Sequence, residues 1–293
     1  MGDKIGVAFN IFGKDIYWYG IIIAVGLVLG VWVAMAEIKR RGYKSDMIID
    51  ACLICVPLAI ICARAYYVIF EWKQYANEWW RIFYVWEGGL AIYGAVIGGV
   101  LGLLIFAKWR KVSFLDLLDA GGLGVIVGQI IGRWGNFANQ EAFGDVVTNP
   151  SLQWFPFSVH IERVPHMHYD LATATNYPIM TPDWHFATFF YEMLWNLLLF
   201  AFLFFWFRKK TKSRGNIFVM YLMVYGIGRA LIELLRQDSL WLVPGVIRVS
   251  SLLGAICFAG GIIYLIIRRN KPLSPRPIPE KYALKPKISE ETE

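Results

Sequence analysis

The sequence predicts an all-α polytopic membrane protein with seven transmembrane helices. Of its 293 residues, 57% are hydrophobic and only 17% are charged, and the mean hydropathy is +0.49. This composition lies far from that of a soluble domain and fits a chain whose solvent is lipid. Aromatic residues make up 16% of the chain, which supports the same fold class because tryptophan and tyrosine collect at membrane interfaces.

Each predicted span is an apolar run close to the length of about 20 residues that a helix needs to cross a bilayer. Seven such runs occur, at residues 16–36, 47–70, 90–107, 114–132, 186–207, 217–235 and 246–267. Ser45 before the second run and Ser113 before the fourth are helix-capping signals. We therefore expect Asp116 and Asp119 to lie at the membrane interface as caps of the fourth span.

Clusters of basic residues predict how the spans are oriented. They follow the first, third, fifth and seventh runs, at residues 39–44, 108–111, 208–214 and 268–271. Because cytoplasmic loops carry an excess of lysine and arginine, we expect the N-terminus outside and the C-terminus in the cytoplasm. A cleavable signal peptide is not indicated, since the dense charge follows the first apolar run instead of preceding it.

The regions between and after the spans predict the domain organisation. The polar, proline-containing residues 134–184 separate the fourth and fifth runs and are expected to form a small extracytoplasmic head. We include this head in one transmembrane catalytic domain, residues 1–270. Residues 271–293 contain several prolines and alternating charges with almost no apolar period, so we expect a disordered cytoplasmic tail.

Neither the charge nor the cysteines point to a separate activity. The formal net charge is +7, but the basic residues form short clusters between apolar runs and no continuous stripe that would bind nucleic acid. The four cysteines all lie within apolar runs, where a free cysteine acts as a small hydrophobic residue. They are Cys52, Cys55, Cys62 and Cys257.

Two stripes of glycine recur at four-residue spacing. They are Gly94, Gly98 and Gly102 in the third run and Gly124, Gly128 and Gly132 in the fourth. Such stripes let membrane helices approach closely, so we expect helix packing to be their main role. The alternative is a lipid headgroup or substrate lying against the exposed backbone.

The strongest candidate for chemistry is the segment at residues 132–144, which reads GRWGNFANQEAFG. It places Arg133, Asn136 and Glu141 at the outer end of the fourth span. Ionisable groups at membrane depth are costly and usually mark a substrate or ion site. Closely spaced Asn and Gly also suit a turn whose backbone N–H groups could hold a phosphate. The alternative is a structural ion pair.

A second polar face lies on the sixth span. Tyr225, Arg229, Glu233 and Arg236 follow one another at steps of four, four and three, which puts them on one side of a helix. A buried ion pair often fails to offset the cost of its desolvation, so stability alone explains this row poorly. The alternative is an Arg229–Glu233 pair that only ties the bundle together.

These polar segments carry a resemblance to a known family. Residues 132–144 resemble the signature segment of the prolipoprotein diacylglyceryl transferases, and the run from Tyr225 to Arg236 is similar to that family's second polar segment. Shorter landmarks agree, namely Trp18-Tyr19-Gly20, Ala63-Arg64-x-Tyr66-Tyr67 and Tyr191-Glu192. The landmarks keep the family's order, so the resemblance covers the chain apart from the head and the tail.

The sequence departs from the family pattern at two places. Many members carry a histidine in the glycine-rich motif of the third span, whereas this chain has Tyr93 there, which excludes a histidine base at that position. The His-Pro pair that precedes Tyr-Glu in the family is also altered. We therefore assign no role to His185.

The resemblance implies a transferase of bacterial lipoprotein maturation. The reaction moves the diacylglyceryl group of phosphatidylglycerol to the thiol of the lipobox cysteine of a prolipoprotein, forming a thioether and releasing glycerol 1-phosphate. The implied catalytic residues are Arg133, Asn136, Glu141, Arg229, Glu233, Tyr93, Tyr19 and Tyr225. The implied phosphatidylglycerol-binding residues are Arg133, Arg229, Asn139, Gly144 and Arg236.

Residue types suggest how these roles divide. Arginine suits a phosphate because its planar fork donates two parallel hydrogen bonds. Glu141 and Glu233 have two alternative roles, which are to orient those arginines or to accept the thiol proton. The tyrosines Tyr19, Tyr93 and Tyr225 either contact the glycerol and relay a proton or simply pack at the interface.

The expected partners are phosphatidylglycerol, prolipoprotein signal peptides with a lipobox cysteine, and membrane lipids. The expected location is the inner (cytoplasmic) membrane, with the active site towards the outer face. No cofactor or metal is expected, since His160, His166 and His168 lack cysteine or acidic partners at metal-binding spacing. The alternative function is a polytopic transporter that uses the intramembrane Arg and Glu residues, although no inverted repeat is visible.

Overall fold

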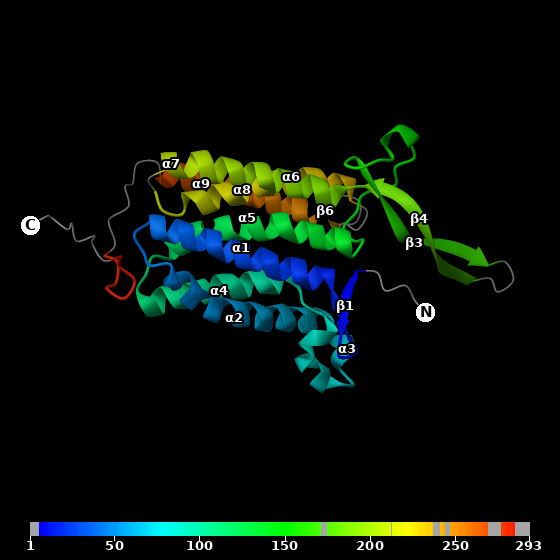
Figure 1. The fold of residues 1–293 in the computed structure, drawn as a ribbon, viewed down its shortest axis with the longest axis horizontal. Coiled ribbons are helices and arrows are strands. Elements are labelled where there is room, and N and C mark those ends of the chain that lie inside the picture. The colour runs from blue at the N-terminus through cyan, green and yellow to red at the C-terminus, as the bar shows by residue number, and fades with distance from the viewer. Residues whose placement is uncertain are drawn as a thin grey trace, which may run out of the picture. The chain divides into compact units, whose positions relative to one another are not determined.

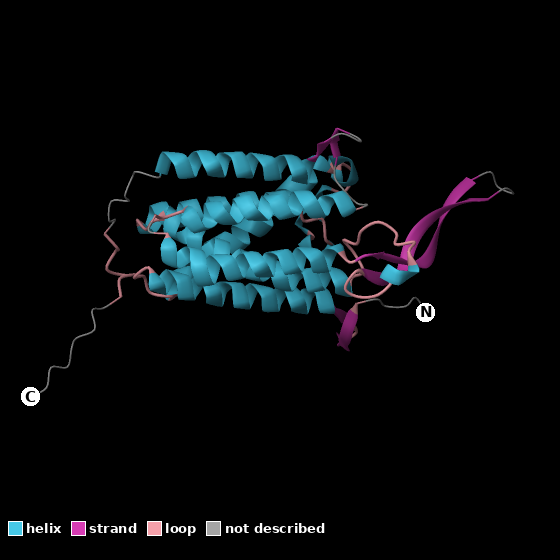
Figure 2. Ribbon diagram, turned by 90° about the horizontal axis from the view of Figure 1, so that it is seen from above, coloured by secondary structure: helices cyan, strands magenta, loops and turns pink. Residues whose placement is uncertain are grey.

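The computed structural model describes residues 6–170, 175–211, 213–236, 241–243, 247–268 and 277–284. At residues 87, 163–170, 175–182, 241–243 and 247 it describes the backbone alone. Within the described residues, seven helices are long and apolar enough to cross a membrane, which confirms the predicted seven-span fold (Figures 1 and 2). They cover Trp18–Arg40, Asp46–Phe70, Ile92–Arg110, Phe114–Ala138, Thr188–Lys210, Asn216–Leu235 and Val249–Ile267.

Five of the seven spans are single α-helices, and the fifth and sixth change helix type along their length. The single helices at the start of the chain are α1 (Trp18–Arg40), α2 (Asp46–Phe70), α4 (Ile92–Arg110) and α5 (Phe114–Ala138). The fifth span joins α6 (Thr188–Ala201), the π-helical η4 (Phe202–Phe207) and α7 (Arg208–Lys210). The sixth joins α8 (Asn216–Ile232) to the 3-10 turn η5 (Glu233–Leu235), and α9 (Val249–Arg268) is the seventh.

Short elements fill the connections between spans. Between α2 and α4 lie α3 (Trp72–Tyr75), η1 (Trp79–Phe83) and η2 (Val85–Glu87), and η3 (Pro150–Leu152) follows α5. Three antiparallel hairpins also occur: β1 (Val7–Ile11) with β2 (Lys14–Tyr17), β3 (Ser158–Asp170) with β4 (Thr175–Phe186), and β5 (Trp241–Val243) with β6 (Ile247–Arg248). These strands were not predicted from the sequence, because hydropathy reports on the spans and not on the polar segments outside them.

The head contains the longest hairpin. Strands β3 and β4 pair from Ser158 opposite Phe186 to Asp170 opposite Thr175 (Figure 1). At the base of the hairpin, Val159 and Ile161 form a small core with Ala187 and Phe189. The hairpin therefore connects directly to the start of α6.

Contacts divide the chain into two compact units. Unit 1 comprises residues 1–30 and 122–272, and unit 2 comprises residues 31–121 and 273–293. The boundaries fall inside α1 and α5. They differ from the predicted division into a catalytic domain at 1–270 and a tail, which stays a prediction.

In unit 2, the first glycine stripe packs α4 against α2. A Cβ placed on Gly98 would lie 2.5 Å from the carbonyl oxygen of Leu58, and one on Gly102 would lie 2.8 Å from the Cα of Cys55. Both distances are too short for a side chain. The stripe therefore serves close helix packing, as expected.

In unit 1, the second glycine stripe packs α5 against α1, where glycines also occur. A Cβ on Gly30 would lie 2.6 Å from the carbonyl oxygen of Gly124, and Gly128 lies close to Gly26. Helices α8 and α9 use the same device, since a Cβ on Gly254 would lie 2.5 Å from the carbonyl oxygen of Gly226. The polar end of α5 is thus held on a closely packed helix pair.

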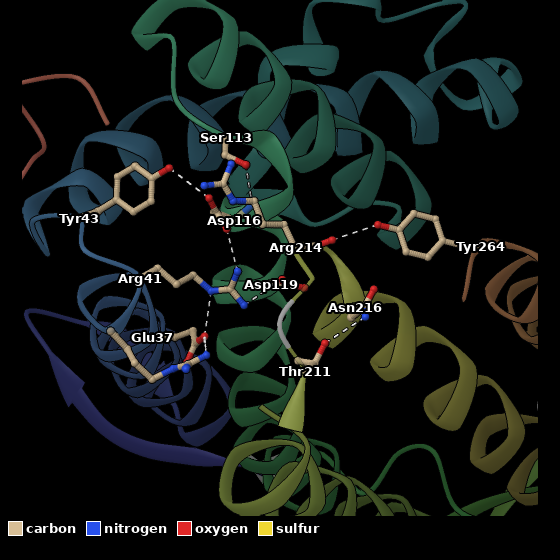
Figure 3. Close-up of polar contacts among 11 residues, drawn as sticks. Glu37, Arg41, Tyr43, Ser113, Asp116, Asp119, Thr211, Arg214, Asn216 and Tyr264 are labelled. Atoms are coloured by element: carbon tan, nitrogen blue, oxygen red, sulfur yellow. Dashed lines mark hydrogen bonds and ion pairs between the residues drawn. The ribbon is translucent and has the colours of Figure 1, made fainter. Parts of the chain in front are cut away.

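A cluster of charged side chains is buried in unit 2 around Arg41 (Figure 3). Its guanidinium contacts Glu37 at 2.9 Å, Asp116 at 2.7 Å and Asp119 at 2.9 Å. The expectation that Asp116 and Asp119 are interfacial caps is therefore corrected, because both are fully buried and paired with Arg41. Burial opposes the charge of Arg41, but the carboxylates of Asp119, Glu37 and Asp116 together hold its pKa above the ordinary value.

The two capping signals have different outcomes. The Ser113 hydroxyl accepts a hydrogen bond from the Asp116 backbone N–H at 3.3 Å, which confirms it as the cap of α5. Ser45 makes no side-chain cap hydrogen bond at the start of α2, so that prediction is wrong. Its hydroxyl lies next to the Asp46 carboxylate instead.

Part of the predicted tail is ordered within unit 2. Tyr282 is buried against Phe106 of α4, and its hydroxyl donates to Asp50 at 2.7 Å. Its carbonyl oxygen accepts from the Lys44 backbone N–H at 2.8 Å. Residues 277–284 thus differ from the expected disorder because an aromatic anchor docks them, and residues 271–276 and 285–293 lie outside the described residues.

Candidate active site

The site forms in unit 1 around Arg133, near the end of α5. This helix continues to Ala138, six residues beyond the predicted end of the fourth span. Arg133 and Asn136 therefore lie on the last two helical turns. The expected phosphate-binding turn is wrong for residues 132–138, because helical backbone N–H groups are used within the helix; only residues 139–144 leave the helix.

Arg133 pairs with a carboxylate that the sequence analysis did not assign to the site. Its Nη2 lies 2.6 Å from Oε1 of Glu192, in the second turn of α6, and its Nη1 donates to Oδ1 of Asn136 at 3.3 Å. The expected partners were Glu141, Glu233 or a lipid phosphate. Glu192, which is 2% exposed, takes the place of the first two.

Glu192 joins two arginines from different helices. Its second oxygen, Oε2, accepts from Nη1 of Arg229 on α8 at 2.9 Å. Arg229 also contacts Glu233 one turn later at 2.8 Å, so the pair offered as the alternative to a substrate role does form, together with the contact to Glu192. Both arginine side chains keep some exposure, 17% for Arg133 and 19% for Arg229, so donors of each can still reach a bound molecule.

Asn136 extends the row of contacts towards the surface. Its side-chain Nδ2 donates to the exposed Glu141 carboxylate at 2.9 Å, while its backbone carbonyl oxygen accepts from the Glu141 backbone N–H at 2.9 Å. The contacts thus run in order from Glu141 through Asn136, Arg133, Glu192 and Arg229 to Glu233. We call these six residues the polar chain.

Two of the predicted tyrosines border the polar chain. The ring of Tyr19 packs on α5, where a Cβ on Gly135 would lie 3.0 Å from its Cδ2. Tyr225 stacks on Tyr221 at 5.6 Å between ring centroids and interacts with the Arg133 guanidinium. Both lie where they can contact a ligand of the arginines.

An open cavity of about 810 Å³ lies beside Tyr19. Asn139 lines it together with residues of β2 and the first turns of α1. The predicted lipid-binding role of Asn139 is thus compatible with its position, although this residue lies beside the polar chain and not within it.

Gly144 and Arg236 meet through their backbones. They form an isolated antiparallel bridge, and a Cβ on Gly144 would lie 2.6 Å from the carbonyl oxygen of Leu235. Gly144 is therefore a close-packing point that holds the segment after α5 against η5. Its predicted lipid-binding role is not tested by this packing.

The remaining predicted residues have other surroundings. Tyr93 belongs to unit 2, where its ring lies 6.3 Å from that of Tyr66, so its catalytic role stays a prediction. His185 is fully buried, and its Nδ1 lies 2.8 Å from the carbonyl oxygen of Gly144. His160 packs on Trp184, and the side chains of His166 and His168 lie outside the described residues.

The part of the chain with described side chains contains no group of three or more metal-ligating residues. The residue that sequence reasoning missed is Glu192. A signal was present, since Glu192 is the one charged residue in the apolar run at 186–207, and such a charge is expensive in a membrane unless it is paired.

The seven spans and the polar chain define a helical membrane protein with a buried arginine-carboxylate site. A family model described as prolipoprotein diacylglyceryl transferase matches residues 6–267. Similar proteins named phosphatidylglycerol–prolipoprotein diacylglyceryl transferase occur in Oceanobacillus iheyensis (43% identity over 90% of this chain and 88% of the relative) and Bacillus velezensis (39%, 90% and 92%). Another, in Limosilactobacillus reuteri, is 43% identical over 87% of this chain and 88% of its own length.

The chain belongs to the prolipoprotein diacylglyceryl transferase family. It is therefore a multi-pass membrane enzyme of the transferase class. The alternative of a transporter is not supported, since the matching family and these relatives are all named as transferases.

Proposed function

We propose that the polar chain is the active site for transfer of a diacylglyceryl group from phosphatidylglycerol to a prolipoprotein cysteine. The observation that carries this proposal is the bridge from one buried carboxylate, Glu192, to the guanidinium groups of Arg133 and Arg229. A shared carboxylate fixes the two forks relative to each other before substrate arrives. Preorganised donors of this kind stabilise charge that develops in a transition state.

The phosphate of the lipid binds to the exposed donors of the two arginines. The cysteine sulfur attacks the glyceryl carbon that carries the phosphate, forming the carbon–sulfur bond as the carbon–oxygen bond breaks. The bonding electrons leave with the phosphate oxygen of glycerol 1-phosphate, and the negative charge on that phosphate therefore increases. Arg133 and Arg229 stabilise that added charge.

The thiol must lose its proton for this attack, since the thiolate is the nucleophile. Glu233 contacts Arg229 at 2.8 Å, so its carboxylate is already engaged by a guanidinium. Glu141 is exposed and accepts a hydrogen bond from the neutral amide of Asn136. We therefore assign Glu141 as the proton acceptor and Glu233 as the residue that orients Arg229.

We infer that the polar chain lies towards the outer side of the cytoplasmic membrane, because basic loops are expected in the cytoplasm and these residues lie at the opposite ends of their spans. Signal peptides that carry a lipobox cysteine can reach this side from the translocation route, and phosphatidylglycerol diffuses to it within the bilayer. The cavity beside Tyr19 and Asn139 is also lined by Gln140, the neighbour of Glu141 in the sequence, and it can accommodate part of one of these substrates.

The test uses purified full-length protein in vesicles that contain phosphatidylglycerol. A peptide with a lipobox cysteine is added, and its mass is measured. We expect a gain that corresponds to a diacylglyceryl thioether, and we expect the same peptide with serine in place of cysteine to remain unmodified. Absence of the thioether from the cysteine peptide would refute the proposed reaction.

A further inference from the structure

Arg64 is a family landmark that the proposed reaction does not use. It lies in the last third of α2 and is 5% exposed. Each of its nitrogens donates to backbone carbonyl oxygens of the connection between α2 and α4. Nε donates to Ile82 (2.8 Å), Nη1 to Gly88 (2.8 Å) and Gly89 (3.1 Å), and Nη2 to Arg81 (2.6 Å) and Tyr84 (3.5 Å).

These contacts show what the connection needs. Its second half consists of short 3-10 turns, and Gly88 and Gly89 have positive φ angles of 89° and 68°. The helical pattern of backbone hydrogen bonds is therefore interrupted, although the Arg81 carbonyl also accepts from the Tyr84 backbone N–H at 3.1 Å. A loop in water satisfies its carbonyl groups with water. Near hydrocarbon, irregular backbone is tolerated only where protein groups satisfy it. The five N–H donors of a guanidinium can do so from inside the protein.

The same connection also carries large exposed aromatic residues. We call them the aromatic platform: Trp72 (53% exposed), Trp79 (61%), Trp80 (46%), Phe83 (68%) and Trp86 (73%). The inner side is formed by Tyr75, which is 7% exposed and lies under the Arg64 guanidinium at 5.0 Å. The connection therefore combines exposed aromatic rings with a buried arginine and a buried tyrosine.

The platform continues the surface of two membrane spans. Phe70, the last residue of α2, is 70% exposed, and Ile92, the first residue of α4, is 71% exposed. Apolar side chains at the ends of such spans face lipid. Tryptophan prefers the level just beyond, where its ring meets acyl chains and its N–H meets headgroups.

We propose that the aromatic platform is a membrane-binding surface that lies in the headgroup layer of the bilayer, and that Arg64 holds it in shape. The partner is the lipid surface itself. This proposal is independent of the transfer reaction, because it rests on unit 2 and on no residue of the polar chain.

The first test measures depth. A nitroxide label is attached at Trp86→Cys and, for comparison, at Glu78→Cys in the same segment, in full-length protein whose four native cysteines are replaced by alanine. In phosphatidylglycerol-containing vesicles, we expect the Trp86 label to be relaxed more by oxygen and less by a water-soluble nickel chelate than the Glu78 label. A Trp86 label fully accessible to the chelate would overturn the proposal. So would one shielded from both reagents, because a protein partner would then cover the platform.

The second test concerns Arg64. Arg64→Lys keeps the charge but cannot donate to all five carbonyl groups, so the label at Trp86 should become more mobile and its depth less defined. Arg81→Lys is the matched control, because the Arg81 side chain is 46% exposed and its ion pair with Glu78 lies at the surface. An unchanged label spectrum in Arg64→Lys would contradict the role of Arg64.

Discussion

Glu192 shows how one residue can decide the chemistry of its neighbours. Two arginines brought close together repel each other, and a carboxylate between them removes that cost while leaving outer donors available. The site is then ready for a phosphate before the lipid arrives. Replacing any member of the polar chain should therefore affect the others, and single substitutions should not be additive.

Arg229→Lys should lose most of the transfer activity, although the protein should still insert into the membrane. Lysine keeps the positive charge but cannot contact Glu192, Glu233 and a phosphate at once, because it has no planar fork. The measurement is the rate of thioether formation at saturating peptide. Turnover near the wild-type rate would leave Arg229 as a simple partner of Glu233.

Arg133→Ala should abolish transfer and phosphatidylglycerol binding with a small effect on thermal stability in lipid-free detergent, because Arg229 still pairs with Glu192. Glu192→Gln should behave differently. It removes the carboxylate that Arg133 contacts, whereas Arg229 keeps Glu233, and a largely buried cation without its carboxylate costs about 3 to 5 kcal/mol.

The two variants are compared by melting temperature and by lipid binding on matched preparations. A larger fall in melting temperature for Arg133→Ala than for Glu192→Gln would mean that Arg133 serves structure more than substrate.

At the scale of elements, the glycine stripes determine how closely the spans pack. Gly98→Ala should destabilise the α2–α4 pair by about 1 to 3 kcal/mol, because the new methyl group would overlap the backbone at Leu58. Its neighbour Gly99 provides the control, since a Cβ there meets nothing within 4 Å. The free energy of unfolding in mixed detergent is measured for both. Equal effects of the two substitutions would mean that helix propensity and not packing is being measured.

The docked segment at residues 277–284 is a second element whose stability can be tested. Tyr282→Phe keeps the ring but loses the hydrogen bond to Asp50, which should weaken docking by about 1 to 2 kcal/mol. A nitroxide label at Leu284→Cys reports the fraction of molecules in which residues 277–284 are undocked and mobile. Tyr264→Phe, which removes a hydroxyl hydrogen bond elsewhere, should leave that fraction unchanged.

The same segment should respond to alkaline pH. Burial and the hydrogen bond to Asp50 raise the pKa of Tyr282, and the hydrogen bond to Asp50 raises the pKa of Lys281. Groups with raised folded-state pKa values contribute stability below their unfolded values of about 10 and lose it as the pH rises through the folded values. The Leu284 label should therefore become mobile above about pH 10. A label that became mobile only when the pH was lowered would contradict this direction of the pH dependence.

For the whole molecule, the prediction to be tested is the membrane topology, with the head outside and the C-terminus in the cytoplasm. A cysteine introduced at Asp170 in the β3–β4 hairpin should react with a membrane-impermeant reagent from outside the cell, and one at Leu284 should react only after the membrane is opened. The basic clusters after alternate spans are the reason. Reaction at Asp170 only from the cytoplasmic side would show that the orientation is reversed.

Much of the fold is determined by local sequence. A membrane span is a matter of length and hydropathy, so the seven spans were predictable, with errors of a few residues where polar side chains continue a helix, as at Arg133 and Asn136. The row from Tyr225 to Arg236 was predictable only in part. Tyr225 and Arg229 lie on α8 and Glu233 follows directly in η5, so the spacing alone puts Arg229 within reach of Glu233, but Arg236 lies beyond the helix in extended backbone and does not share that face.

Only the tertiary structure decided which distant charges meet. Arg133 and Glu192 are 59 positions apart and Arg229 and Glu192 are 37 apart, and Arg41 is 75 positions from Asp116. Composition and periodicity show that a buried charge needs a partner, but from the sequence alone several carboxylates were equally suitable partners. The choice depends on which helix faces pack together. Glycine contacts between backbones set that packing, and the spacing of residues along one helix does not encode it.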